Sequence, residues 1–163
     1  MSDDGLVILT LTRVEAAHLT DLVTQFQQLV TEDPAGDDPA VARLTPDAYP
    51  DDADASREFE SVTRGDLLGR RAHDAATVRS DLARIEDASV GEALSPVDVS
   101  IAGDHLDPWL RTLSALRLVL ASRLGISDDA EHDEDDPAYG LYEWIGYRLE
   151  GLVQVAEQRD ARD

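Results

Sequence analysis

The chain contains no cysteine and no lysine, few aromatic residues and no long apolar run. Without cysteine it forms no disulfide and no thiolate zinc site, and it has neither a cysteine nucleophile nor a thiol redox sensor. No apolar run approaches the roughly 20 residues that a membrane-spanning helix needs. The first residues lack the basic region of a secretion signal, so we expect a cytoplasmic protein without membrane contact.

Positive charge is also scarce. The sequence has 14 basic residues, all of them arginine, against 35 acidic residues, which gives a net charge of −21 over 163 residues. Such a surface repels nucleic acid and anionic lipid at long range, which predicts that the protein does not bind DNA directly. Because 42% of the residues are hydrophobic, the chain can still fold, and we expect one domain over residues 1–163.

Apolar periodicity predicts a mainly α-helical domain, similar to a helical bundle, with a small two-stranded β-sheet. Residues 6–11 and 97–101 alternate like half-buried strands, and two short strands need one another as partners. The ends, residues 1–5 and 158–163, are expected to be flexible. Helices are expected over residues 12–32, 39–44, 55–62, 63–85, 104–125 and 137–157.

Polar residues stand at five expected helix starts, where a side-chain oxygen accepts a hydrogen bond from a free main-chain N–H. These expected caps are Thr12, Asp38, Thr63, Asp104 and Asp136. Gly125 stands where a left-handed residue commonly ends a helix.

The two C-terminal helices carry matched apolar stripes, and the first of them is apolar on more than one side, which predicts that it is central. The residues expected to be buried together are Leu110, Leu113, Leu120, Leu141, Ile145 and Leu149.

Acidic side chains make up seven of the nine residues from 128 to 136. Clustered oxygens suit calcium, but an EF-hand register beginning at Asp129 places Glu134 where the turn glycine belongs and Gly140 where the bidentate glutamate belongs. We interpret the run as a solvated loop whose last aspartate caps a helix. Weak cation binding stays open as an alternative.

No motif indicates catalysis. The four histidines lie on four different segments, and no pair has the spacing that places two metal ligands on one helix face. The sequence has no Gly-x-Ser-x-Gly elbow, and no glycine-rich loop follows either strand. We therefore expect no enzyme, and no catalytic, cofactor-binding or metal-binding residues.

Two sets of residues are candidates for contact with a partner. Trp144, Tyr147 and Val155 lie away from the main stripe of the last helix, and form either a second core face or a contact for another chain, such as a second copy in a homodimer. Residues 57–84 hold six arginines and five acids, a net charge of +1. Here Arg64, Arg70 and Arg71 would meet an anionic group, unless pairs such as Asp66 with Arg70 neutralise them.

Three segments, taken in order, resemble a known family. They are DDPAVARLTPDAY (37–49), DPWLRTLSALRLVLASRLGI (107–126) and DDPAYGLYEWIGYRLEGLV (135–153). They are similar to an actinobacterial family long described as a domain of unknown function, which is named for the oxidative-stress transcriptional regulator AosR and is often encoded beside the Clp-protease adaptor ClpS. The similarity covers about residues 12–155.

The resemblance implies a non-enzymatic regulatory protein that acts on transcription mainly through a protein partner, possible partners including the transcription machinery. A Cys-x-x-x-Cys pair senses oxidants in redox-active members, and a chain without cysteine lacks that switch. The alternative is a structural or adaptor-type helical protein connected to Clp-dependent proteolysis.

Overall fold

The computed structural model describes residues 5–32, 38–45, 53–85, 92–126 and 135–162. It confirms a mainly α-helical domain with one two-stranded sheet. The elements in chain order are β1 (Val7–Thr12), α1 (Arg13–Glu32), α2 (Pro39–Leu44), α3 (Ala53–Ala83), β2 (Pro96–Ile101), the short 3₁₀ helix η1 (Gly103–His105), α4 (Leu106–Leu124) and α5 (Pro137–Asp160).

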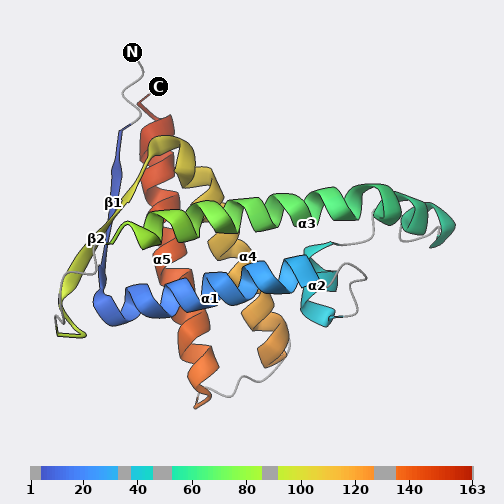
Figure 1. The fold of residues 1–163 in the computed structure, drawn as a ribbon, viewed down its shortest axis with the longest axis horizontal. Helices are drawn as coiled ribbons and strands as arrows, with labels where there is room; N and C mark the ends of the chain where they lie inside the picture. The colour runs from blue at the N-terminus through green and yellow to red at the C-terminus, as the bar shows by residue number, and fades with distance from the viewer. Residues whose placement is uncertain (1–4, 33–37, 46–52, 86–91, 127–134, 163) are drawn as a thin grey trace.

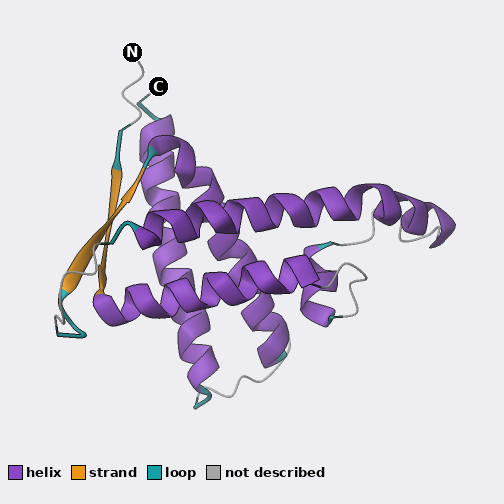
Figure 2. Ribbon diagram, viewed as in Figure 1, coloured by secondary structure: helices purple, strands orange, loops and turns teal. Residues whose placement is uncertain are grey.

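The helices form two crossed layers. α1 and α3 lie side by side, and behind them α4 and α5 pack against one another and cross their direction (Figure 1). α2 packs against α4. The two strands stand together at one side of the helices (Figure 2). α4 contacts α1, α2, α3 and α5, so its expected central position is confirmed.

The sheet is antiparallel, as the paired alternation of the two segments predicts. Val7 lies opposite Ile101, and the register continues to Thr12 opposite Pro96. Val7, Leu11 and Ile101 are buried against the helices, whereas the exposed residues alternate with them on the outer face. One face of the sheet therefore packs against the core, and the other face is exposed.

Several local signals at helix ends are confirmed. The N–H of Glu15 donates to Thr12 Oγ1 at 3.2 Å, and Asp38 and Asp136 accept from the second residue of their helices, each at 2.9 Å. Gly125 ends α4 with φ 66°, a left-handed conformation that favours glycine.

Asp38 also joins α2 to α4. Its carboxylate accepts hydrogen bonds from both terminal nitrogens of Arg123, at 2.8 and 2.7 Å. These bonds, together with the N–H of Ala40, hold the pKa of Asp38 below its ordinary value despite the opposing effect of burial.

Two expected helix starts are wrong. Thr63 lies inside α3, which runs without a break from Ala53 to Ala83. An interior glycine such as Gly65 costs a helix only about 1 kcal/mol, and α3 contains no proline to stop it. Asp104 lies within η1, and α4 begins at Leu106 without a side-chain cap, because main-chain bonds of η1 supply the turn.

The core is built around α4. Trp109, Leu113 and Ile145 are almost completely buried. The other four residues of the expected cluster are only half-buried, because α1 and α3 cover one side of the layer that α4 and α5 form. These four are Leu110, Leu120, Leu141 and Leu149.

The last helix is longer than expected. α5 continues to Asp160, so residues 158–160 are helical, and the expectation of a flexible end is wrong for them. Arg159 Nη1 donates a hydrogen bond to the main-chain carbonyl of Gly5. The start of β1 and the end of α5 therefore lie at the same corner of the molecule (Figure 1).

Candidate functional site

The expected contact residues of α5 divide between the core and the surface. Trp144 and Val155 are partly buried and pack against the hydrophobic core. Tyr147 remains 71% exposed. The interpretation as a second core face therefore holds for two of the three residues, and Tyr147 is left as the one available to a partner.

Tyr147 lies beside a groove between β1 and α5, which we call the β1–α5 groove. Its β1 wall is residues 7–9, and its α5 wall includes Tyr147, Gly151 and Val155. The groove has a volume of about 310 Å³. Ile8 is 49% exposed on the β1 side, so large apolar side chains from two elements meet at this surface.

Arg148 fixes the position of this part of α5. Its guanidinium donates to Glu15 Oε2 at 2.8 Å and lies over the rings of Trp144 and Tyr147, 5.9 and 5.4 Å from their centroids. Cation–π contact of this kind orients an aromatic ring as well as attracting the cation. Tyr147 is thus an exposed ring on a braced helix.

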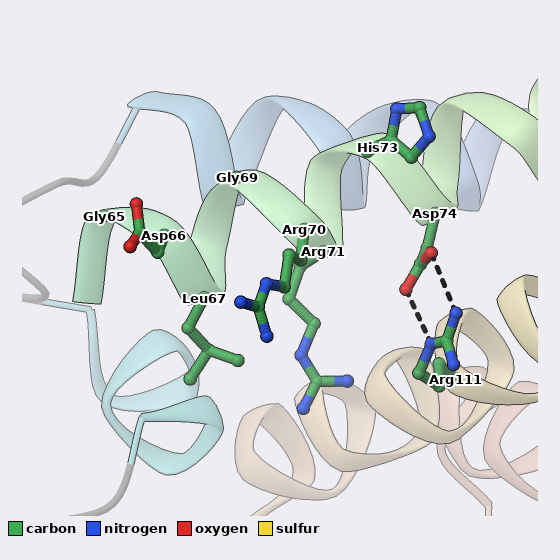
Figure 3. Close-up of a pocket in the computed structure, with 9 residues that line it drawn as sticks. All are labelled: Gly65, Asp66, Leu67, Gly69, Arg70, Arg71, His73, Asp74 and Arg111. Carbon is green, nitrogen blue, oxygen red and sulfur yellow. Dashed lines mark hydrogen bonds and ion pairs between the residues drawn. The ribbon is translucent and has the colours of Figure 1, made fainter. Parts of the chain in front are cut away.

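The expected arginine cluster lies on α3, at a hollow of about 860 Å³ that shares no residue with the β1–α5 groove. Figure 3 shows its lining residues, which all come from α3 except Arg111 of α4. Arg70 and Arg71 line it, whereas Arg64 does not. We name this feature the arginine hollow.

Arg70 is not neutralised as expected. The structure records no ion pair between Asp66 and Arg70, and no dashed line joins these two side chains in Figure 3. Asp74 instead pairs with Arg111, with 2.9 Å between Asp74 Oδ2 and Arg111 Nε, and raises the pKa of the guanidinium. Arg71 Nε is buried without a hydrogen-bond partner among the described residues.

The arginine hollow could accept one carboxylate or phosphate group, because planar guanidinium forks match both. Its charge is low, however. Asp66 and Asp74 oppose Arg70, Arg71 and Arg111, which leaves one net positive charge within a chain of −21. It is therefore a weak site for any extended polyanion.

The core contains a buried polar group that the apolar periodicity does not predict. Asp81, whose side chain is fully buried, accepts from Trp109 Nε1 at 2.9 Å, and His105 Nδ1 lies 3.0 Å from both of its oxygens. The sequence signal was an acid on the inward side of α3, beside Val78 and Leu82. The arrangement joins α3 to α4.

The described residues contain no group of three or more His, Asp or Glu side chains placed to hold a metal ion. Of the acidic run, only Asp135 and Asp136 are described, and Asp136 caps α5 as expected. Residues 128–134 lie outside the described part of the chain. Within that part, no helix is both long enough and apolar enough to cross a membrane.

Comparison with known families gives one match. The model of a family described as "Domain of unknown function (DUF2017)" matches residues 1–156. No curated protein and no solved structure matches the chain.

Proposed function

We propose that this chain, which belongs to the DUF2017 family, is a non-enzymatic regulatory protein that acts by binding another protein. The observation that carries this proposal is the β1–α5 groove with Tyr147 exposed beside it. Tyrosine combines a large apolar body with a polar tip and is enriched where proteins bind one another. A braced helix that leaves this ring in water offers a ready contact.

The charge of the chain supports a basic partner. A net charge of −21 attracts positively charged surfaces over long distances and accelerates their encounter. Beside the groove Glu150 is exposed, whereas the charge of Arg148 is matched by Glu15. The apolar groove gives close contact, and the acidic surroundings select the partner.

With the resemblance to AosR-like regulators, these features lead us to a more specific proposal. The protein works in the cytoplasm, in transcription regulation under oxidative stress, and its partner is a basic surface of the transcription machinery. It does not sense oxidants through thiols, because the chain has no cysteine.

A homodimer uses the same face. Two chains of −21 repel one another, so self-association through Tyr147 and Ile8 requires salt to screen the charge. At ordinary salt the face is free for a basic partner.

The test is capture of partners from the native lysate with the wild type and two variants. Tyr147→Glu places a charge beside the groove, whereas Leu94→Glu makes the same kind of change at a site that is 76% exposed and does not line the groove. We expect the wild type and Leu94→Glu to capture basic transcription proteins, and Tyr147→Glu to capture none of them. Equal capture by all three would contradict the proposal, and capture of Clp components would favour the adaptor alternative.

A further inference from the structure

The outer edge of β1 offers main-chain hydrogen-bonding groups. In an antiparallel pair, successive residues direct their N–H and C=O alternately toward the partner strand and away from it. Two observations fix this alternation. The N–H of Arg13 donates to the carbonyl of Ser95 at 3.0 Å, and Pro96, which has no N–H, lies opposite the preceding residue, Thr12.

Every second residue before Arg13 therefore directs its main-chain groups toward β2, namely Leu11, Leu9 and Val7. Ile8 and Thr10 therefore direct theirs away from it. In the described part of the chain, β1 is paired with β2 alone, and no further strand lies on its other side. This outer edge is a row of donors and acceptors suited to another strand.

The two edges of the sheet differ in how they are protected. β2 carries Pro96 and Asp98, a proline and a charge of the kind that prevent unwanted pairing. By contrast, β1 and the residue before it (6–12, LVILTLT) contain no charge, proline or glycine, although 30% of the whole chain is charged. Natural proteins rarely leave such an edge bare, which favours its use by a partner.

We propose that β1 binds an extended segment of another protein as an added strand, in which apolar residues alternate with lysine or arginine. This inference rests on the proposed function and specifies its partner. The added strand pairs with Ile8 and Thr10. Because side chains of a strand alternate between its faces, one set enters the β1–α5 groove and the other stays in water.

Gly151 is consistent with a closely packed occupant. It lies within α5 on the wall of the groove, and a Cβ placed on it meets no atom within 4 Å. Glycine weakens a helix interior, and no contact within the described chain requires it there. A strand seated against α5 would use the space.

Charge decides between a foreign segment and a second copy. A second copy brings another −21, whereas a segment with lysine or arginine is attracted to the same surface. We therefore assign the edge to a basic segment, and pairing of two β1 edges becomes an outcome that the experiment can detect.

The experiment begins with a random linear peptide library displayed on phage and selected on the immobilised protein. Ile8→Pro removes the N–H that points away from β2 but leaves the main-chain groups of Val7 and Leu9 that bond to β2. Pro96 likewise occupies a position of β2 that donates no hydrogen bond to β1. Ile8→Thr is the matched control, because it keeps the N–H and a β-branched side chain. If Ile8→Pro lowers the thermal unfolding temperature strongly, Thr10→Pro is used instead, because it removes the next outward N–H.

We expect peptides that alternate apolar and basic residues, bound equally by the wild type and Ile8→Thr. Loss of a main-chain hydrogen bond in Ile8→Pro should weaken them about tenfold. Bound peptide should slow amide hydrogen exchange at Ile8 and Thr10 in NMR spectra, which side-chain docking alone would not do.

The inference would be overturned if the library gave no enriched peptide or gave acidic peptides. It would also be overturned if the peptides bound Ile8→Pro and Thr10→Pro as tightly as the wild type. A fourth contrary result is protection of the Ile8 and Thr10 amides by self-association at ordinary salt. The last result assigns the edge to a second copy. A lysate partner that requires Tyr147 but binds Ile8→Pro normally would leave the proposed function standing and refute strand addition alone. Indifference of that partner to Tyr147→Glu would instead refute the proposed function.

Discussion

The indole N–H of Trp109 donates a 2.9 Å hydrogen bond to Asp81, so the largest of the fully buried side chains is bonded to a fully buried carboxylate. His105 contacts the same carboxylate from the less buried side. A buried carboxylate is tolerated only when donors of this kind surround it. These two contacts join α3 to α4, as the Asp74–Arg111 pair does at the surface.

Trp109→Phe should destabilise the fold by about 1–3 kcal/mol, because it leaves one buried lone pair of Asp81 without its donor. Urea unfolding followed by circular dichroism measures the loss. Trp144→Phe is the matched control, because the indole N–H of Trp144 has no hydrogen-bond partner in the described structure. Equal losses in the two variants would show that the Asp81 bond contributes nothing specific.

The pair between Asp38 and Arg123 predicts a pH dependence. The pKa of Asp38 is lowered from 3.8, so its contribution to stability is fully present above about that pH and is lost as the pH falls through the lower folded-state value. Arg123→Gln should therefore be less stable than the wild type near neutral pH and converge with it in acid. Because the Arg123 side chain is 48% exposed, the neutral difference should not exceed about 1 kcal/mol.

Asp38→Asn separates the pair from the helix cap, because asparagine caps as well as aspartate but carries no charge. It should lose the same pH-dependent stability as Arg123→Gln. A difference between wild type and Arg123→Gln that grows below pH 3.8 has the opposite sign and would contradict the assignment.

Self-association should increase with salt and require Tyr147. Salt screens the repulsion between two chains of −21, whereas the apolar contact is not weakened by it. Sedimentation velocity at low and high salt should show dimer mainly at high salt, and Tyr147→Glu should stay monomeric in both. Trp144→Glu is a poorer probe, because that side chain packs against the core. A dimer of Tyr147→Glu at high salt would place the interface elsewhere.

Random duplex DNA should bind weakly. Neutralisation of several phosphates normally provides non-specific affinity, and the arginine hollow offers only one net positive charge. Fluorescence anisotropy at physiological salt should give a dissociation constant weaker than about 10⁻⁶ M, the strong end of ordinary non-specific affinity. Tighter binding that disappears in an Arg70→Glu, Arg71→Glu variant would make this hollow a DNA site.

The sequence predicts the parts of the fold that depend on local patterns. Alternation in residues 6–11 and 97–101 identifies both strands, and caps such as Thr12 and Asp38 depend on residues a few positions away. Thr63 fails as a helix start because α3 continues through it without a proline, and its interior glycines cost the helix too little to end it. Local propensity is a weak prior where tertiary packing continues the helix.

The candidate site is less predictable, because it depends on neighbours from distant segments. Trp144, Tyr147 and Val155 share one side of α5, and only the position of the core separates the exposed ring from its two packed neighbours. The outward direction of the main chain at Ile8 requires the register with β2. No spacing within either segment contains that information.

The contact between Arg159 and Gly5 joins residues 154 positions apart in the sequence. The first residue of the described chain is therefore held by the last turn of its final helix, immediately before the uncharged strand begins. A truncation that removes this turn would release the entry to β1 without altering any residue of the strand. One hydrogen bond therefore couples the start of the strand to the last turn of α5.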